Sequence, residues 1–256
     1  MDSALILGAP TFVLAFARVA GILGSGPFFS GRSVPTSLKI GLAFFVTLLV
    51  LPLLHPGTVQ LPPTLLATCL AVLREVAIGA AVGLLAQLVF AAVQMAGELL
   101  GLQMGFSLMN LVDPTTGVTV PVISEVYGFF AALLFFVLDA HHLFLRGIFA
   151  SFELAPLGTG SFHPATGVAL AAAVGQVFEM ALELAGPVLA ALFLTDVALG
   201  LVARTIPQMN VFTVGFPLKI ALGLMALAMT LPLLAGVLEH QFSVLETSVR
   251  QLLHGM

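Results

Sequence analysis

Six long apolar segments, separated by breaks rich in glycine and proline, make up most of this chain. Between Leu61 and Val112 the only charged residues are Arg74, Glu75 and Glu98. About 20 residues of α-helix cross the hydrocarbon layer of a membrane, so segments of this length predict an all-α integral membrane protein with about six long, kinked helices. The segments cover roughly residues 4–24, 38–54, 64–97, 120–150, 166–203 and 211–238.

The composition supports a membrane protein and restricts its functions. Apolar residues make up 60 % of the chain and charged residues 8 %, whereas soluble proteins average about 25 % charged residues. The formal net charge is −4 and no basic run occurs, which argues against nucleic-acid binding. Cys69 is the only cysteine, which excludes an internal disulfide. Tryptophan is absent and Tyr127 is the only tyrosine. Because the usual interfacial aromatic belt is missing, protein rather than lipid is indicated as the main neighbour of these helices.

Two features of the C-terminal half are not explained by helices that simply cross a membrane. As one helix, segment 166–203 would be about 57 Å long, nearly twice the hydrocarbon thickness. Gly186-Pro187 lies inside it and is expected to kink or split it. After Glu239 the apolar residues fall on one helical face, which predicts either an amphipathic helix on a surface or a packed terminal helix. The residues on that face are Leu238, Phe242, Leu245, Val249 and Leu252.

Charged residues inside the apolar segments are the first candidates for function. Glu179 and Glu183 are four residues apart, so they share one helical face. Paired carboxylates in an apolar segment can relay protons, or they can face water or the polar groups of a partner. Arg74 and Glu75 are adjacent and point about 100° apart, so each is expected to find a partner elsewhere.

The run Asp139-Ala140-His141-His142 suggests a metal site at first sight. Asp139 and His142 are three residues apart, on one face of a helix. Metal sites in proteins use three or four ligands, however, and no further group of ligands is evident along the chain. We therefore predict no metal, and a polar contact at a helix end or between helices.

The stretch from Gly97 to Pro121 interrupts two apolar segments and contains the turn-forming run Asp-Pro-Thr-Thr-Gly. Gly101 and Gly105 are four residues apart, a spacing that lets helices approach closely. The methionines before the turn have unbranched, pliable side chains, which can close around irregular cargo and then separate. Ordinary core packing followed by a loop explains the same residues, so the pattern alone leaves both interpretations open.

This stretch resembles the central segment of a known family. The run Gly101-Leu-Gln-Met-Gly-Phe106, followed by Asp113-Pro114, Gly117 and Pro121, is similar to that of the FliR proteins. These are membrane proteins of the flagellar type III export gate, and they are related to the T component of injectisomes.

Further motifs extend the resemblance over essentially the whole chain. Leu138-Asp139-Ala140-His141 is similar to the family's Leu-Asp-Gly-His and departs from it at Ala140. The runs Pro-Gln-Met-Asn at 207–210 and Val-Gly-Phe-Pro-Leu-Lys-Ile at 214–220 resemble another family signature. The same stretch resembles the Gln-x-Asn…Phe-x-Pro-Lys-Ile pattern of FliQ, a small two-helix partner subunit.

What the resemblance implies is a non-enzymatic subunit of the flagellar export gate, which helps form and seal the pore for unfolded flagellar subunits. It implies a FliP-like part (1–165) with a plug segment (101–121), a FliQ-like hairpin (166–238) and an amphipathic tail (239–256). The expected partners are FliP, FliQ, the FlhB-type export switch protein, transient unfolded substrates and membrane lipid, with no cofactor, metal or nucleic acid. The expected location is the bacterial inner membrane, in the flagellar basal body.

The candidate site residues form three groups. The resemblance implies that the pore plug or gasket consists of Gln103, Met104, Gly105, Phe106, Met109, Asp113, Pro114 and Gly117. It implies that the cytoplasmic entrance of the hairpin includes Gln208, Asn210, Pro217 and Lys219. The candidates for polar contacts within the membrane are Arg74, Glu75, Asp139, His141, Glu179 and Glu183.

Three other functions fit parts of the pattern. An injectisome export-gate subunit is the nearest alternative, although the Gln-Met-Gly-Phe and Pro-Gln-Met-Asn runs favour the flagellar system. A proton-coupled secondary transporter would use broken helices together with Glu179 and Glu183. A membrane-embedded enzyme would be centred on Asp139, His141 and His142, and would hold a metal ion.

Overall fold

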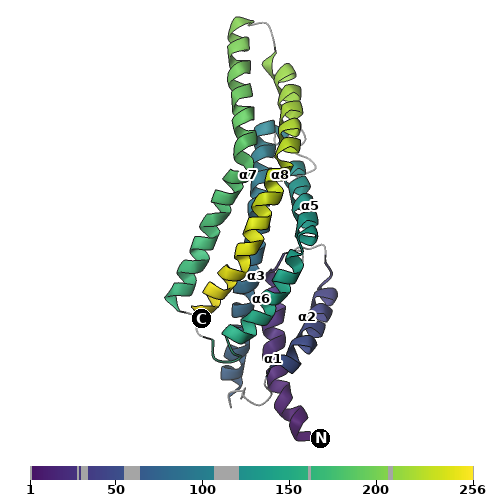
Figure 1. Ribbon diagram of the computed structural model, residues 1–256, viewed down its shortest axis with the longest axis vertical. Helices are drawn as coiled ribbons and strands as arrows, with labels where there is room; N and C mark the ends of the chain where they lie inside the picture. The colour runs from purple at the N-terminus through teal and green to yellow at the C-terminus, as the bar shows by residue number, and fades with distance from the viewer. Residues whose placement is uncertain are drawn as a thin grey trace. The chain divides into compact units, whose positions relative to one another are not determined.

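The computed structural model describes residues 2–27, 29, 34–54, 64–106, 121–160, 163–206 and 210–255. Within these residues all regular structure is helical and no strand occurs, so the predicted all-α fold is confirmed. The helices are α1 (Asp2–Ser25), α2 (Thr36–Val50), the short 3-10 helix η1 (Leu51–Leu53), α3 (Leu65–Met104), α5 (Val122–Val137), α6 (Ala140–Leu154), α7 (Pro164–Thr205) and α8 (Val211–His254) (Figure 1).

Three helices in the described chain are long and apolar enough to cross a membrane, judged by length and composition. They correspond to α3, α7 and α8, and the broken pair α5 and α6 adds a fourth if it counts as one span. The sequence predicts a single segment at 120–150, but the chain is broken there at Leu138 and Asp139. Asp139 has φ 54°, a left-handed conformation that stops a right-handed helix.

The two long C-terminal helices are less interrupted than the sequence suggests. α7 continues through Gly186-Pro187, so the split predicted there as one of two outcomes does not occur. Membrane helices tolerate proline because neighbouring groups can satisfy the carbonyl that loses its donor. α8 likewise runs through Glu239 to His254 without a break. Its terminal apolar face is buried, which selects a packed terminal helix over a surface helix; the buried residues are Leu238, Phe242, Leu245, Val249 and Leu252.

The chain forms two compact units that each combine separate segments. Unit 1 contains Met1–Leu88, Asp139–Val174 and Phe242–Met256, and unit 2 contains Val89–Leu138 and Gly175–Gln241. These units are defined by contacts within the chain. The division into FliP-like and FliQ-like parts at residue 165 concerns resemblance to other subunits, and it stays a prediction.

Unit 1 is held together by close contact between α1 and the first part of α3. A Cβ atom added to Gly21 would lie 2.5 Å from the carbonyl oxygen of Val76, so only glycine allows this approach. Ser25 Oγ, also on α1, donates to the Ala80 carbonyl at 3.0 Å. Helix α2 packs on the same helix α1 (Figure 1). The apolar core of the unit includes Leu14, Ile22, Ala43, Ile78, Ile148 and Leu252.

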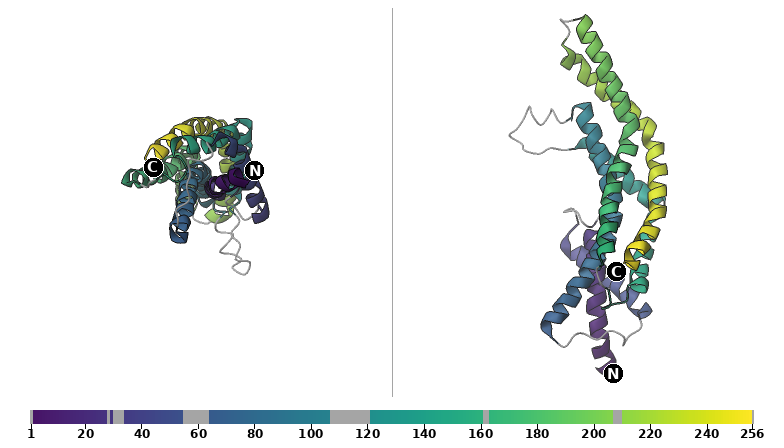
Figure 2. Two further views of the ribbon diagram at one scale, coloured as in Figure 1. Left: turned by 90° about the horizontal axis from the view of Figure 1, so that it is seen from below. Right: turned by 90° about the vertical axis from the view of Figure 1, so that its left-hand side faces the viewer.

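Unit 2 brings together the second part of α3, α5, and most of α7 and α8. A Cβ on Gly97 of α3 would lie 2.5 Å from the Cα of Ser124 on α5, and Ser124 Oγ donates to the Gln94 carbonyl at 3.1 Å. Tyr127 and Thr230 share a side-chain hydrogen bond that joins α5 to α8. Figure 2 shows α7 and α8 side by side along this unit. The helices α3 and α5, which come before and after residues 107–120 in the sequence, are therefore both packed within unit 2.

Candidate functional site

The most deeply buried charges of unit 1 form an ion pair between α1 and α3. Arg18 and Glu75 are both 0 % exposed, and Arg18 Nε donates to Glu75 Oε2 at 2.6 Å. Arg18 Nη2 lies 2.6 Å from the same oxygen. Glu75 thus has its partner 57 residues away along the chain, whereas its neighbour Arg74 is exposed.

The remaining polar atoms of this pair reach the end of α6. Arg18 Nη1 donates to the carbonyl oxygens of Ser151 and Ala155, each at 2.6 Å. Ser151 lies in the last turn of α6 and Ala155 is its C-cap residue, so both carbonyls lie at the end of the helix that favours a positive charge. Glu75 Oε1 accepts the backbone N–H of Gly158 at 2.8 Å, and Gly158 has φ +80°, which glycine adopts without strain.

The arrangement around Arg18 and Glu75 is suited to holding helices together rather than to catalysis or ligand binding. The guanidinium also lies over the ring of Phe152, 4.9 Å from its centroid, and such a contact adds attraction. Both carboxylate oxygens of Glu75 accept hydrogen bonds, and Nε and Nη1 of Arg18 donate them. Nη2 of Arg18 adds an ion-pair contact with Glu75 but donates no hydrogen bond. A buried charge pair is tolerated when most of its hydrogen-bonding capacity is satisfied in this way. The pair therefore joins α1, α3 and α6 and has no accessible group for a substrate.

A second polar cluster lies in unit 2 and connects three helices. Gln103 Nε2, at the end of α3, donates to Asp196 Oδ2 on α7 at 2.9 Å. The other oxygen of Asp196 forms an ion pair with Lys219 Nζ on α8. The structure thus brings together Gln103, predicted for the plug, and Lys219, predicted for the hairpin. We call Gln103, Asp196 and Lys219 the polar triad.

The described part of the predicted plug lies at the end of α3. Met104 is fully buried, and a Cβ on Gly223 of α8 would overlap its side chain. Gly105 has φ 90° and follows the last helical residue, a common way for a helix to end. Phe106 is half-buried. The roles of these residues in a plug stay predictions. Four residues of the predicted plug lie outside the described residues: Met109, Asp113, Pro114 and Gly117.

The predicted hairpin residues take different positions. Asn210 precedes α8, and its side-chain oxygen accepts the backbone N–H of Thr213 at 3.4 Å, as an N-cap residue does. Pro217 lies inside α8 and is exposed. Gln208 lies outside the described residues. Whether this end of the hairpin faces the cytoplasm stays a prediction.

Glu179 and Glu183 are both exposed on α7. They stand between exposed apolar side chains, since Phe178 is 55 % and Leu182 is 57 % exposed. Neither carboxylate is enclosed with a second titratable group in a cavity, so their surroundings suit contact with another molecule better than an internal proton relay.

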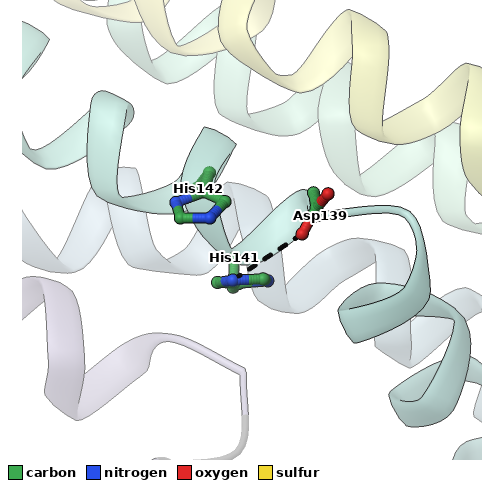
Figure 3. A group of neighbouring side chains, drawn as sticks. All are labelled: Asp139, His141 and His142. Carbon is green, nitrogen blue, oxygen red and sulfur yellow. Dashed lines mark ion pairs between the residues drawn. The ribbon is translucent and has the colours of Figure 1, made fainter.

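The start of α6 gathers three groups that can bind metals. Asp139, His141 and His142 each offer a ligand atom, and these atoms lie within 4.8 Å of one another (Figure 3). His141 Nε2 lies 3.9 Å from Asp139 Oδ1. Ligands sit roughly 2.0–2.2 Å from a zinc ion, so bound ligand atoms would have to be closer together, and a fourth ligand is usual. The three side chains therefore form a loose polar cluster at the start of α6, which is the kind of helix-end contact that the sequence predicts.

The departure from the family motif at Ala140 is accommodated locally. Ala140 is the first residue of α6 and is 1 % exposed. The positive φ at this bend belongs to Asp139, not to Ala140. A glycine is therefore not required at position 140 of this chain.

Sequence reasoning missed Arg18 and Asp196 as central residues. Each is an isolated charge inside an apolar segment, and that was the signal available. Their partners could not be chosen from spacing, because Arg18 pairs across 57 residues and Asp196 accepts from Gln103 across 93 residues.

The helices and their internal polar contacts define an all-α membrane protein without an evident catalytic centre among the described residues. Residues 9–245 match the family described as bacterial export proteins, family 1. The chain is 36 % identical over 252 residues to the flagellar biosynthetic protein FliR of Bacillus subtilis (strain 168), covering 95 % of each chain.

Two further relatives give the same result. The flagellar biosynthetic protein FliR of Pectobacterium carotovorum subsp. carotovorum is 36 % identical over 91 % of this chain and 88 % of its own. That of Escherichia coli (strain K12) is 36 % identical over 88 % of this chain and 86 % of its own. The chain belongs to the FliR family of bacterial export proteins, and it is a flagellar export-gate subunit. The family predicted from the sequence motifs is confirmed.

Proposed function

We propose that this subunit helps form and seal the conduit for unfolded flagellar subunits in the bacterial inner membrane. In this proposal it assembles with FliP and FliQ, and the assembly works with the FlhB-type export switch protein. The single observation that carries the proposal is that α7 and α8 have largely uncovered apolar surfaces, with two carboxylates on that of α7.

The degree of burial differs sharply among the long helices. In α3, 61 % of the most apolar stretch is buried within this chain, compared with 22 % in each of α7 and α8. An uncovered apolar helix can face either lipid or protein. Composition alone does not separate the two, because lipid tails and leucine side chains are equally apolar.

The carboxylates on α7 favour a protein cover. Glu179 and Glu183 are exposed among apolar side chains, and an acidic side chain at the centre of a bilayer costs about 2.5–3.5 kcal/mol on insertion scales. Two such charges on one face are costly against hydrocarbon, but they can be paired by donors of a neighbouring subunit. Companion helices that carry basic or amide side chains would therefore cover this face.

Co-purification tests this assembly. We expect two smaller hydrophobic subunits, FliP and FliQ, to accompany the tagged chain from membranes in a stable particle. Glu179→Lys combined with Glu183→Lys should reduce their recovery strongly, because the new charges repel basic partners. Glu239→Lys, which alters an exposed carboxylate on α8, is the matched control and should leave recovery unchanged. A chain that purifies alone as a stable monomer from cells containing all subunits would contradict the proposal.

The sealing role is assigned to segment 101–121. Its support is the family resemblance of the Gln-Met-Gly-Phe run, together with the packed helices α3 and α5 on either side. Deletion of residues 106–116 should raise the leakage of small ions across the membrane while subunit export continues. The control is the intact chain at the same expression level. An unchanged leak would refute the sealing role without affecting the co-purification result.

A further inference from the structure

We propose that Asp196 is a positioning residue of the export gate, which holds the end of α3 in register with both helices of the α7–α8 hairpin. The inference relies on membership of the export family and not on the proposed plug or the proposed partner contacts. It concerns contacts within unit 2 alone.

The two oxygens of Asp196 serve two different helices. Oδ2 accepts from Gln103 of α3 at 2.9 Å, and Oδ1 pairs with Lys219 of α8. A carboxylate used in this way fixes three helices with one side chain. Charge-assisted hydrogen bonds are shorter and stronger than neutral ones, and both contacts of Asp196 involve its charged carboxylate.

An apolar contact next to the triad depends on the same register. Met104 follows Gln103 on α3, and Gly223 lies four residues after Lys219, on the same face of α8. Gly223 is buried, and its missing side chain leaves the space that Met104 occupies. Rotating α3 by one residue turns its side chains by about 100°, which would break the polar and the apolar contact together.

The alternative is that the ion pair between Asp196 and Lys219 has no effect on how the helices are positioned. Exposed ion pairs contribute little because water screens them and the side chains lose freedom. The Asp196 side chain is 37 % exposed, but that of Lys219 is only 16 % exposed. Removing the carboxylate would leave a mostly buried ammonium group without its ion-pair partner, and this favours a movement of α8 relative to α3.

A disulfide across the Met104–Gly223 contact measures this register directly. Met104 Cγ lies 2.9 Å from the position of a Cβ on residue 223. The two Cβ atoms of a cysteine pair would then be about 4.4 Å apart or less, within the range of roughly 3.5–4.5 Å that a disulfide requires. The pair Met104→Cys with Gly223→Cys is placed in a Cys69→Ser background, which removes the exposed native thiol.

The experiment compares the initial rate of cross-linking in membranes under mild oxidation. Asp196→Asn should lower the rate roughly tenfold, the factor that corresponds to about 1.4 kcal/mol, while the amount of chain in the membrane is unchanged. Glu239→Gln makes the same carboxylate-to-amide change on an exposed site of α8 and should leave the rate unchanged. In the otherwise native chain, Asp196→Asn should also reduce flagellar export.

A charge exchange separates positioning from general damage. Asp196→Lys combined with Lys219→Asp keeps the ion pair, and the Gln103 amide can turn its oxygen toward the new ammonium. The exchange should restore the cross-linking rate and export relative to each single variant. An unchanged rate in Asp196→Asn, or no recovery in the exchange, overturns the proposal.

A milder variant keeps the proposal testable if the Asp196→Asn chain does not accumulate in the membrane. Gln103→Leu removes one contact of the triad and leaves the ion pair in place. Slower cross-linking at an unchanged amount of chain supports the proposal, and an unchanged rate overturns it. Because the disulfide forms within one chain, failed co-purification or an unchanged ion leak would not alter this result.

Discussion

Both compact units join three helices through a carboxylate and the cation that pairs with it, yet they do so in different surroundings. In unit 1 the pair Arg18–Glu75 is 0 % exposed on both sides, and backbone groups of α6 and the following turn provide further hydrogen bonds. In unit 2 Asp196 remains 37 % exposed, and its helices α7 and α8 leave much of their apolar surface uncovered.

The comparison shows two ways of handling charge in an apolar protein. Unit 1 satisfies its charges internally, which makes the pair part of the core. Unit 2 keeps its charges at the margin of a surface that we propose other subunits cover. Substitutions should therefore affect stability most in unit 1, and assembly or register most in unit 2.

The largest effect is expected from breaking the pair in unit 1. Arg18→Leu should destabilise the protein by about 3–5 kcal/mol, because it leaves the Glu75 carboxylate buried without its counter-ion. Thermal melting of the purified protein in detergent, or loss of the chain from membranes, measures this. Arg74→Leu is the control on the same helix, since Arg74 is exposed and its loss should change stability by less than about 1 kcal/mol. Equal melting of both variants would contradict the comparison.

The next effect concerns the close approach of α1 and α3. A Cβ on Gly79 would overlap the carbonyl oxygen of Arg18, so Gly79→Ala should force the helices apart and cost about 1–3 kcal/mol. Gly128 of α5 has no heavy atom within 4 Å of an added Cβ. Gly128→Ala should therefore be neutral or stabilise by up to about 1 kcal/mol, because alanine favours helix. Melting temperatures of the two variants decide this, and a tolerated alanine at residue 79 would count against the packing described for unit 1.

A matched pair of substitutions compares the two carboxylates directly. Glu75→Gln and Asp196→Asn each replace a carboxylate by an amide of similar shape. We expect the first to lower stability by several times more than the second, whose cost should be about 1 kcal/mol because Asp196 is partly solvated. Melting of both variants at low and high salt sharpens the test, since only the contribution of Asp196 should weaken with added salt.

The smallest effects are expected at the start of α6. Ala140→Gly introduces the residue of the family's Leu-Asp-Gly-His motif, yet it should destabilise by about 0.5–1 kcal/mol because residue 140 is helical here. Asp139→Gly should change stability by less than about 1 kcal/mol, because the relief of strain at φ 54° is offset by the greater freedom of glycine in the unfolded chain. If Ala140→Gly raised the melting temperature, the assignment of the left-handed residue to Asp139 would be wrong.

Much of the fold could be predicted from local pattern. Apolar segments of membrane length predict helices because each backbone group must find its partner within the segment when water is absent. The Gln-Met-Gly-Phe and Pro-Gln-Met-Asn runs were sufficient to indicate the family, which the relatives confirm. The continuity of α7 through Pro187 and the break at Asp139 were not determined locally, because both depend on what neighbouring helices allow.

The sequence by itself determined that this chain is an all-α membrane protein of an export family, since helical periodicity, apolar length and short motifs are properties of neighbouring residues. Only the tertiary structure decided that Glu75 pairs with Arg18 and that Asp196 connects Gln103 to Lys219. The physical reason is that a charge in an apolar helix must find a partner in space, and the partner's place in the sequence follows from helix packing rather than from spacing.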